Sequence, residues 1–412
     1  MADSVLVIGG GAAGCRAACA AAELGAEVTL LERNAKIGRK VMITGKGRCN
    51  VTNARYDLQE ILSHIPTNPT FLYSALAGFM PQDTMDLFES LGVPLKIERG
   101  NRVFPVSDKA VDIVDAMERD LRRHHVHRVH ARAAHLVAED GRIRGAETEH
   151  GNLLPADAVI LSTGGGSYPR TGSTGDGYRM AQEIGHTVTP LSPSLVPMIS
   201  SDPCCRELNG LNLRNIAIQV SEPGVERPVY EDFGELQFTP FGVSGPTILS
   251  ASSHIRRIAH PLTLTIDLKP ALSEEQLDAR IQRDFHADLN REFRYSLGKL
   301  LPRKLIPVII SRSGIDPEKP LHQITREERE HLLQNLKAFS LPLTGFRPLS
   351  EAIVTSGGIS VKEIDPHSMQ SRLVDGLFFA GEIIDVDGYT GGYNLQIAFA
   401  TGTMAGQHAV YF

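Results

Sequence analysis

The first part of the chain alternates between apolar and glycine-rich segments in an order typical of one structural unit. Apolar residues 5–8 predict a buried strand, residues 9–14 predict a tight turn, and the alanine-rich stretch that follows predicts a helix. A second apolar strand then ends on Glu32. This pattern predicts a parallel unit of strand, helix and strand, which is the building block of an α/β Rossmann domain.

The hydrophobic pattern changes along the rest of the chain and returns to its first form at the end. Short strands interrupted by proline and glycine follow the first α/β stretch, and then charged residues alternate with Leu and Ile at helical spacing. We therefore predict an α/β domain made of residues 1–190 and 346–412, a β-rich inserted domain made of 191–270 and 338–345, and a helical insert over 271–337.

Two further features of the first α/β stretch matter below. Apolar residues predict a strand pair over 126–137 and 142–149. A buried strand over 156–163 then stops at three consecutive glycines, which begin at Gly164.

Composition narrows the class of protein. The 412 residues include 42% hydrophobic and 22% charged residues, as in ordinary globular proteins, and the formal net charge is -6. This charge gives no general attraction to nucleic acid or anionic membranes. No apolar run is long enough for a membrane span, the amino terminus leaves no room for a signal peptide, and five cysteines form no even framework. We expect a cytoplasmic protein.

The glycine-rich turn has the composition of a dinucleotide-binding motif. Gly9 suits the tight turn, Gly11 lets the backbone approach a pyrophosphate, and Gly14 lets helix and strand pack closely. The helix amino end adds N–H groups and partial positive charge. Glu32 stands where an acid would accept hydrogen bonds from a ribose.

The carboxyl-terminal stretch favours a flavin over nicotinamide as the resident cofactor. Gly381 and Glu382 follow a buried strand, and the run 391–396 opens the last helix. A second helix amino end therefore faces the crevice of the first, where it could stabilise negative charge on a reduced flavin. Bound nicotinamide would not need that second end.

A basic, glycine-rich loop over residues 38–53 adds cations to the same site. Lys40 and Arg48 are the candidates for contact with phosphate or flavin, while a solvated basic loop is the alternative interpretation. Cys49 lies in this loop without a second thiol nearby in sequence, so we expect no disulfide reductase chemistry.

Several motifs together resemble those of the BaiN-like bacterial flavoproteins. They are Gly9 to Gly14 with Glu32, the run Thr44 to Asn53, Thr163 to Gly165, and the block Asp385 to Gln396 that follows Ala380 to Glu382. The resemblance covers essentially the whole chain. It implies a glutathione-reductase-type FAD-binding Rossmann domain, bound FAD, an inserted β-barrel-like lobe and a small helical lobe. Members of this family are assigned different reactions, including the reduction of bile-acid enones and the oxidation of aminoacetone.

The candidate site follows from these motifs. Proximity to the flavin makes Tyr393, Tyr389 and Arg170 the candidate catalytic residues, as proton donors or as a clamp for a substrate oxygen. Asp176 either lines the pocket or caps a helix. The residues expected to bind the cofactor are Gly9, Gly11, Ala12, Ala13, Gly14, Glu32, Arg33, Lys40, Gly45, Gly47, Arg48, Cys49, Asn50, Thr163, Gly164, Gly165, Asp176, Gly381, Glu382, Gly391, Gly392, Asn394 and Leu395.

The resulting hypothesis is an FAD-dependent oxidoreductase acting on a small or medium organic substrate. We expect reduction of a conjugated C=C bond, with NAD(P)H as a transient electron donor because no second dinucleotide motif is evident. The alternatives are an amine oxidase that produces peroxide, as on aminoacetone, and an RNA-modifying or non-catalytic flavin-binding protein. Nucleic acid is the less favoured partner, no membrane partner is expected, and the oligomeric state stays open.

A cluster of histidines around residues 124–135 is the only hint of a metal. No carboxylate or cysteine recurs around it with metal-ligand spacing. We interpret it as an exposed basic edge and predict no metal site.

Overall fold

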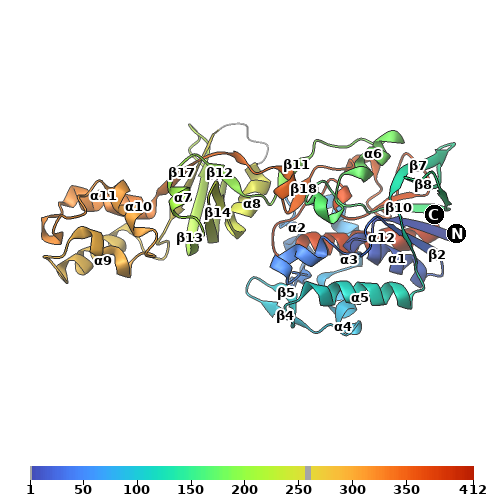
Figure 1. Ribbon diagram of the computed structural model, residues 1–412, viewed down its shortest axis with the longest axis horizontal. Coiled ribbons are helices and arrows are strands. Elements are labelled where there is room, and N and C mark those ends of the chain that lie inside the picture. The colour runs from blue at the N-terminus through green and yellow to red at the C-terminus, as the bar shows by residue number, and fades with distance from the viewer. Residues whose placement is uncertain (1, 256–260) are drawn as a thin grey trace. The chain divides into compact units, whose positions relative to one another are not determined.

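The computed structural model describes residues 2–255 and 261–412, and the chain forms two compact units (Figure 1). The first unit contains Met1–Ser194 and Pro348–Phe412, and the second contains Leu195–Arg347. Both ends of the chain therefore build the same unit. No helix among the described residues combines the length and apolar character needed to cross a bilayer.

A parallel sheet forms the centre of the first unit. Its strands in the described part of the chain lie in the order β19-β10-β1-β2-β6. The pairs along the sheet are parallel, and the middle strands are buried because helices cover both faces of such a sheet. These strands are β1 (Ser4–Ile8), β2 (Glu27–Glu32), β6 (His127–His130), β10 (Ala158–Leu161) and β19 (Leu377–Phe379). The Rossmann-type sheet predicted from the sequence is confirmed.

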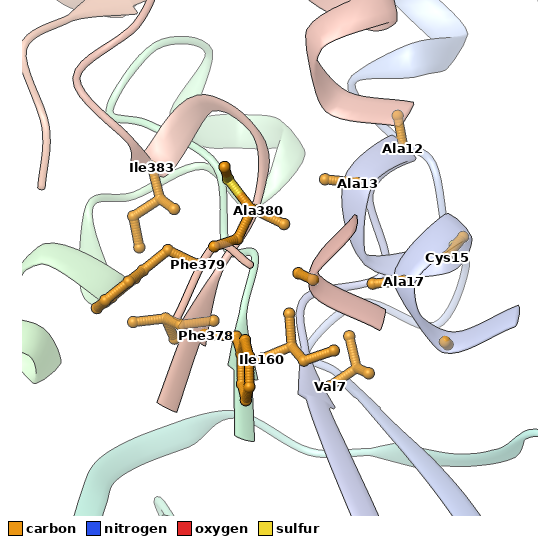
Figure 2. Close-up of a cluster of buried hydrophobic side chains, with 14 of the residues drawn as sticks. Val7, Ala12, Ala13, Cys15, Ala17, Ile160, Phe378, Phe379, Ala380 and Ile383 are labelled. Atoms are coloured by element: carbon orange, nitrogen blue, oxygen red, sulfur yellow. The ribbon is translucent and has the colours of Figure 1, made fainter. Parts of the chain in front are cut away.

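The carboxyl-terminal segment completes this core. Strand β19 pairs with β10, and Phe378 lies in register with Ile160 and Val7 in the cluster beside helix α1 (Figure 2). The helices of this unit are α1 (Ala12–Glu23), α2 (Leu58–Leu62), α3 (Tyr73–Gly78), α4 (Pro81–Ser90), α5 (Ala110–Arg123), α6 (Asp176–Glu183) and α12 (Tyr393–Tyr411).

Helices α1 and α12 pack closely through small residues. A Cβ added at Gly402 would lie 2.4 Å from the backbone oxygen of Ala13, and one added at Gly406 would lie 2.3 Å from that of Ala17. The glycines of α12 therefore let the two helix backbones come into contact. This close contact holds together segments from opposite ends of the chain.

Replacing Gly402 by alanine should lower the free energy of unfolding by about 2 kcal/mol, because the added methyl forces the two helices apart. Gly298→Ala is the matched control, since a Cβ at Gly298 meets no atom within 4 Å in the described part of the chain beyond its neighbours in sequence. Urea unfolding measures both variants. Equal stability of Gly402→Ala and the control would contradict this account of the packing.

Smaller sheets surround the core, and one of them corrects the sequence analysis. The predicted strand pair over 126–137 and 142–149 is wrong in its first half, because residues 127–130 form β6 and pair with β2. The antiparallel partner of β8 is β7, which follows β6 in the chain. The smaller strands are β3 (Thr52–Asn53), β4 (Leu95–Glu98), β5 (Arg102–Pro105), β7 (Ala133–Glu139), β8 (Arg142–Thr148), β9 (Leu153–Pro155), β11 (Ser192–Ser194) and β18 (Val354–Ser356).

The second unit contains a closed antiparallel barrel and several helices (Figure 1). The barrel strands run in the order β12-β15-β14-β13-β16-β17, which confirms the predicted β-barrel-like lobe. Their bounds are Met198–Ser200, Gly242–Ser244, Tyr230–Thr239, Asn212–Ser221, Leu262–Asp267 and Phe339–Phe346, in that order. The helices are α7 (Cys204–Glu207), α8 (Pro246–Ile255), α9 (Glu274–His286), α10 (Ile306–Ser313) and α11 (Arg326–Lys337). One hydrophobic cluster is shared by barrel and helices, and the predicted division into three domains stays a prediction.

Capping boxes and ion pairs stabilise the two helices that carry many charged residues, α9 and α11. Ser273 caps α9 and Thr325 caps α11 by accepting hydrogen bonds from backbone N–H groups. Arg329 pairs with Asp278 at 2.6 Å, and Arg326 pairs with Glu330 at 2.7 Å. The charge runs of this segment thus lie on partly exposed helix faces, where they pair with one another.

Candidate functional site

The turn between β1 and α1 contains three motif glycines, and each of them is needed for a different physical reason. Gly9 has φ +108°, and a Cβ there would lie 2.6 Å from the backbone oxygen of Ser162. A Cβ at Gly14 would lie 1.8 Å from the backbone oxygen of Gly9. Apart from its chain neighbours, no described residue has an atom within 4 Å of a Cβ at Gly11, the residue that caps α1. The turn is therefore crowded toward the sheet and open at Gly11, where a pyrophosphate would approach.

Glu32 is held beside this turn by three hydrogen bonds. Its Oε2 accepts from the backbone N of Gly10 at 2.7 Å, and its Oε1 accepts from the backbone N and the Nδ2 of Asn34, both at 2.7 Å. The carboxylate is buried at the end of β2, and it is oriented toward the motif as a ribose-binding acid requires.

Helix α12 brings a second amino end to the site. Gly392 caps this helix with φ +102°, and a Cβ there would lie 2.3 Å from the backbone oxygen of Thr52. The side chain of Asn394 closes the preceding loop: its Oδ1 accepts from the backbone N of Gly388 at 2.9 Å, and its Nδ2 donates to the oxygen of Gly388 at 2.7 Å. Partial positive charge at this end suits a group that becomes negative.

One cavity in the first unit connects these features. It encloses about 1350 Å³ of empty space, part of it open to solvent, and is lined by the glycine turn, Glu32, the segment 380–382 and the start of α12. Two helix amino ends, an open glycine cradle and an acid placed to bind a ribose meet in one cavity, and this combination fits FAD.

The structure brings most of the predicted cofactor residues to this cavity. Those that line it are Gly9, Gly11, Ala12, Ala13, Glu32, Arg33, Lys40, Thr163, Gly164, Asp176, Gly381, Glu382, Asn394 and Leu395. Predicted residues that lie outside its lining are Gly14, Gly45, Gly47, Arg48, Cys49, Asn50, Gly165, Gly391, Gly392, Arg170, Tyr389 and Tyr393. Gly14 and Gly392 act there through backbone packing, which needs no contact with a ligand.

Lys40 and Glu382 form an ion pair within the lining. The Nζ of Lys40 donates to both carboxylate oxygens of Glu382, at 2.9 and 2.6 Å, and to the Oγ of Ser167 at 2.6 Å. Glu382 also accepts from the backbone N of Thr355 at 2.8 Å. Sequence motifs identified Lys40 and Glu382 separately, but no sequence signal joins residues this far apart or points to Ser167 and Thr355.

Arg48 is used differently from the phosphate contact that the sequence suggested. Its guanidinium donates to Glu98 and Asp108, and its Nε lies 2.8 Å from the Asp108 carboxylate. The guanidinium also lies over the ring of Phe104, 4.1 Å from its centroid. Arg48 therefore fastens the basic loop to the β4 and β5 hairpin.

The predicted catalytic tyrosines lie near the start of α12. The hydroxyl of Tyr393 accepts from the Nε of Arg55 at 2.9 Å, and its ring stacks on His64 with centroids 4.7 Å apart. Burial raises the pKa of Tyr393. Tyr389 is half-buried beside the same histidine, and Arg170 is exposed in the segment after β10.

Asp176 is corrected with respect to the capping interpretation. Gly175 is the residue that caps α6, and Asp176 is the first residue of that helix. Its carboxylate accepts from Arg132 and Arg33, so the side chain is engaged with two cations and not with a helix cap.

Cys49 is buried and chemically quiet. Burial raises the pKa of its thiol to about 12, which leaves almost no thiolate at neutral pH. We expect Cys49→Ser to retain its FAD and largely its turnover. Flavin absorbance and the rate of flavin reduction measure this, and loss of turnover with FAD still bound would contradict it.

The described residues contain no group of three His, Cys, Asp or Glu side chains that could hold a metal. The histidines of the predicted basic edge pair instead with local groups: His135 with Glu183, and His124 with Glu23 and Asp120.

Fold and cavity define a class, the FAD-binding oxidoreductases with a Rossmann-type domain. Residues 3–408 match the family model of the HI0933-like protein Rossmann domain. The chain belongs to the HI0933-like family.

Relatives in this family extend over the whole chain. The chain is 33% identical to 3-dehydro-bile acid delta(4,6)-reductase of Clostridium scindens, with 98% of each protein covered. It is 29% identical to the ribosomal RNA dihydrouridine synthase of Escherichia coli, with 98% of this chain and 97% of the relative covered.

Solved structures agree on the fold. The 3-ketosteroid delta1-dehydrogenase of Sterolibacterium denitrificans matches with a TM-score of 0.54 and 14% identity, over 99% of this chain and 100% of that one. The E. coli quinol fumarate reductase subunit FrdA matches with a TM-score of 0.54 and 18% identity, over 99% and 70%. At this level of identity they show the fold alone.

Proposed function

We propose that this protein uses FAD to reduce a C=C bond conjugated with a carbonyl group. The observation that carries the proposal is one cavity bordered by both helix amino ends. It is supported by the similarity of the chain to proteins named 3-dehydro-bile acid delta(4,6)-reductase and ribosomal RNA dihydrouridine synthase. Dihydrouridine differs from uridine by two hydrogens across a C=C bond conjugated with a carbonyl, so both named activities require the same addition.

The chemistry that bound, reduced FAD would supply here is hydride donation to the electron-poor carbon of such a bond. The chain orients the cofactor and provides electrostatic support. The amino end of α12 would stabilise negative charge on the bound cofactor, and Lys40 and Glu382 form a fixed polar pair in the lining.

A proton must reach the second carbon of the bond. Tyr389 and Tyr393 are the proposed donors, and Arg170 is the proposed contact for a substrate oxygen. The hydroxyl of Tyr393 accepts a hydrogen bond from Arg55, which orients it. Replacing each tyrosine by phenylalanine tests them: full FAD content and an unchanged substrate-reduction rate in both variants would remove them from the mechanism.

NADH or NADPH is the proposed source of electrons. The test is anaerobic titration of the purified yellow protein with each nucleotide, followed by addition of a cyclic enone to the bleached flavin. We expect bleaching by one nucleotide and reoxidation by the enone. Anaerobic bleaching by aminoacetone and none by NAD(P)H, with peroxide formed once air is readmitted, would replace this proposal with an amine oxidase.

A second candidate substrate is a uracil base in ribosomal RNA. The relatives named as ribosomal RNA dihydrouridine synthases in E. coli and Haemophilus influenzae, at 29% and 28% identity, support it. The net charge of -6 opposes general binding to RNA. Adding transcribed ribosomal RNA to the bleached flavin separates the two candidates, because only an RNA-modifying enzyme would be reoxidised by it and leave dihydrouridine in the transcript.

A further inference from the structure

A short segment after β10 crosses one end of the cavity. We name residues 171–176 the strap. Thr171, Gly172, Ser173 and Asp176 of the strap line the cavity. Gly172 has φ +111°, and a Cβ there would lie 2.6 Å from the Nδ2 of Asn34. The strap therefore lies directly against the residues that follow β2.

Four side-chain contacts tie the strap to Arg33, Asn34 and Arg132, which line the same cavity. Asn34 Nδ2 donates to the backbone oxygen of Thr171 at 3.2 Å, and Arg33 Nη1 donates to Thr174 Oγ1 at 2.8 Å. Arg33 Nη1 also pairs with Asp176 Oδ2 at 2.9 Å. Arg132 binds Asp176 with two parallel hydrogen bonds, Nε to Oδ2 at 2.9 Å and Nη2 to Oδ1 at 2.8 Å. A bidentate pair of this kind fixes orientation as well as distance.

The strap lies at the adenosine end of the cavity. Arg33 and Asn34 come directly after Glu32, and Asn34 Nδ2 donates to Glu32 Oε1 as well as to the strap. Arg132 follows β6, whose His130 stands opposite Glu32 in the sheet. The flavin end is marked instead by the start of α12, so the ties gather around the ribose acid.

We propose that the strap is a latch that closes over the adenosine half of FAD and sets how fast the cofactor leaves. Asp176 is its positioning residue, since one carboxylate receives both arginines. The proposal rests on FAD being the cofactor in the proposed function, and it requires no particular substrate. The ion pairs are partly exposed: the side chains of Arg33, Arg132 and Asp176 retain 32%, 40% and 18% of their accessible surface. Salt should therefore weaken the latch.

The test measures release of FAD from the holoprotein after dilution, by the recovery of free flavin fluorescence. We expect Asp176→Asn to release FAD about 10-fold faster than the unmodified protein, since one tenfold step corresponds to the loss of about one charge-assisted contact. Release from the unmodified protein should also accelerate between 0.05 and 1 M NaCl on the order of several-fold, and the variant should respond less.

Glu183→Gln is the matched control. It removes the same charge from the other end of α6, where Glu183 pairs with Arg179 and His135 away from the cavity. Arg132→Gln serves as a second latch variant. The affinity of ADP, which has no flavin, should fall by the same factor as that of FAD.

Several outcomes would overturn the latch. They are equal release rates for Asp176→Asn and Glu183→Gln, an unmodified protein whose release rate does not change with salt, or a loss of FAD affinity without a loss of ADP affinity. If Asp176→Asn fails to fold, the release rates of Arg132→Gln and of the unmodified protein in the salt series test the latch without it. Failure of the reductase proposal would leave these binding measurements unchanged, so the two can be told apart.

Discussion

Gly11→Ala should bind FAD at least about 100-fold more weakly than the unmodified protein and still fold normally. A hundredfold change corresponds to about 2.7 kcal/mol of binding free energy. The added methyl meets no atom of the described residues within 4 Å beyond its chain neighbours, so we expect it to add little strain to the protein itself. Gly11 lines the cavity and caps α1, however, and the methyl would stand between the backbone N–H groups and the pyrophosphate.

The measurement is a titration of apoprotein with FAD, followed by flavin fluorescence, together with circular dichroism and urea unfolding of the apoprotein. Gly78→Ala is the matched control, because a Cβ at Gly78 also meets nothing within 4 Å while Gly78 lies outside the lining. Unchanged FAD affinity in Gly11→Ala would show that the pyrophosphate does not approach this turn.

The parts of the fold that the sequence predicts best are those whose signal is local. The turn 9–14 and its flanking strands can be predicted from residues that are adjacent in sequence. Glycine is required in this turn because of its backbone conformation and the close approach of neighbouring backbone. The return of the α/β pattern after the insert was also visible, since a buried strand and a glycine-capped helix follow each other directly in 377–396. Barrel strands showed as short segments broken by glycine and proline.

The parts that sequence reasoning missed depend on contacts between distant residues. Residues 127–130 have no pattern that distinguishes a parallel sheet from a hairpin, and only pairing with β2 decides it. Nothing in the sequence distinguishes the roles of Arg48 and Arg132. In the structure Arg48 pairs with acids outside the cavity, Glu98 and Asp108, whereas Arg132 holds Asp176 at the cavity. Which carboxylate an arginine pairs with depends on the folded structure, so spacing along the chain does not show which arginine lies at the cavity.

The ion pair of Lys40 and Glu382 shows the same limit at the centre of the site. Each residue stands in a recognisable motif, but their partnership arises only because β19 joins the sheet beside β10. The carboxylate also accepts from Thr355 in β18, so three separate segments of the chain fix one acid. A site assembled this way binds its cofactor only when the whole first unit has formed.

Gly14→Ala should destabilise the protein by more than about 3 kcal/mol, in contrast to Gly11→Ala. Its Cβ would lie 1.8 Å from the backbone oxygen of Gly9 and 2.5 Å from the Oγ of Ser162, so α1 would have to move away from the sheet. Because α1 contacts α12 through Gly402, that movement would also separate the two helix amino ends at the cavity.

Urea unfolding of the two apoproteins measures the difference, and FAD titration follows it. A loss of this size is a large fraction of the 5–15 kcal/mol that typically keeps a domain folded, so Gly14→Ala should also be poorly soluble and free of flavin. Gly11→Ala, which removes the same glycine flexibility from the same turn, controls for the change of residue type. If both variants unfolded at the same urea concentration, close packing at Gly14 would not be what holds α1 against the sheet, and the convergence of the two helices on one cofactor would lose its structural basis.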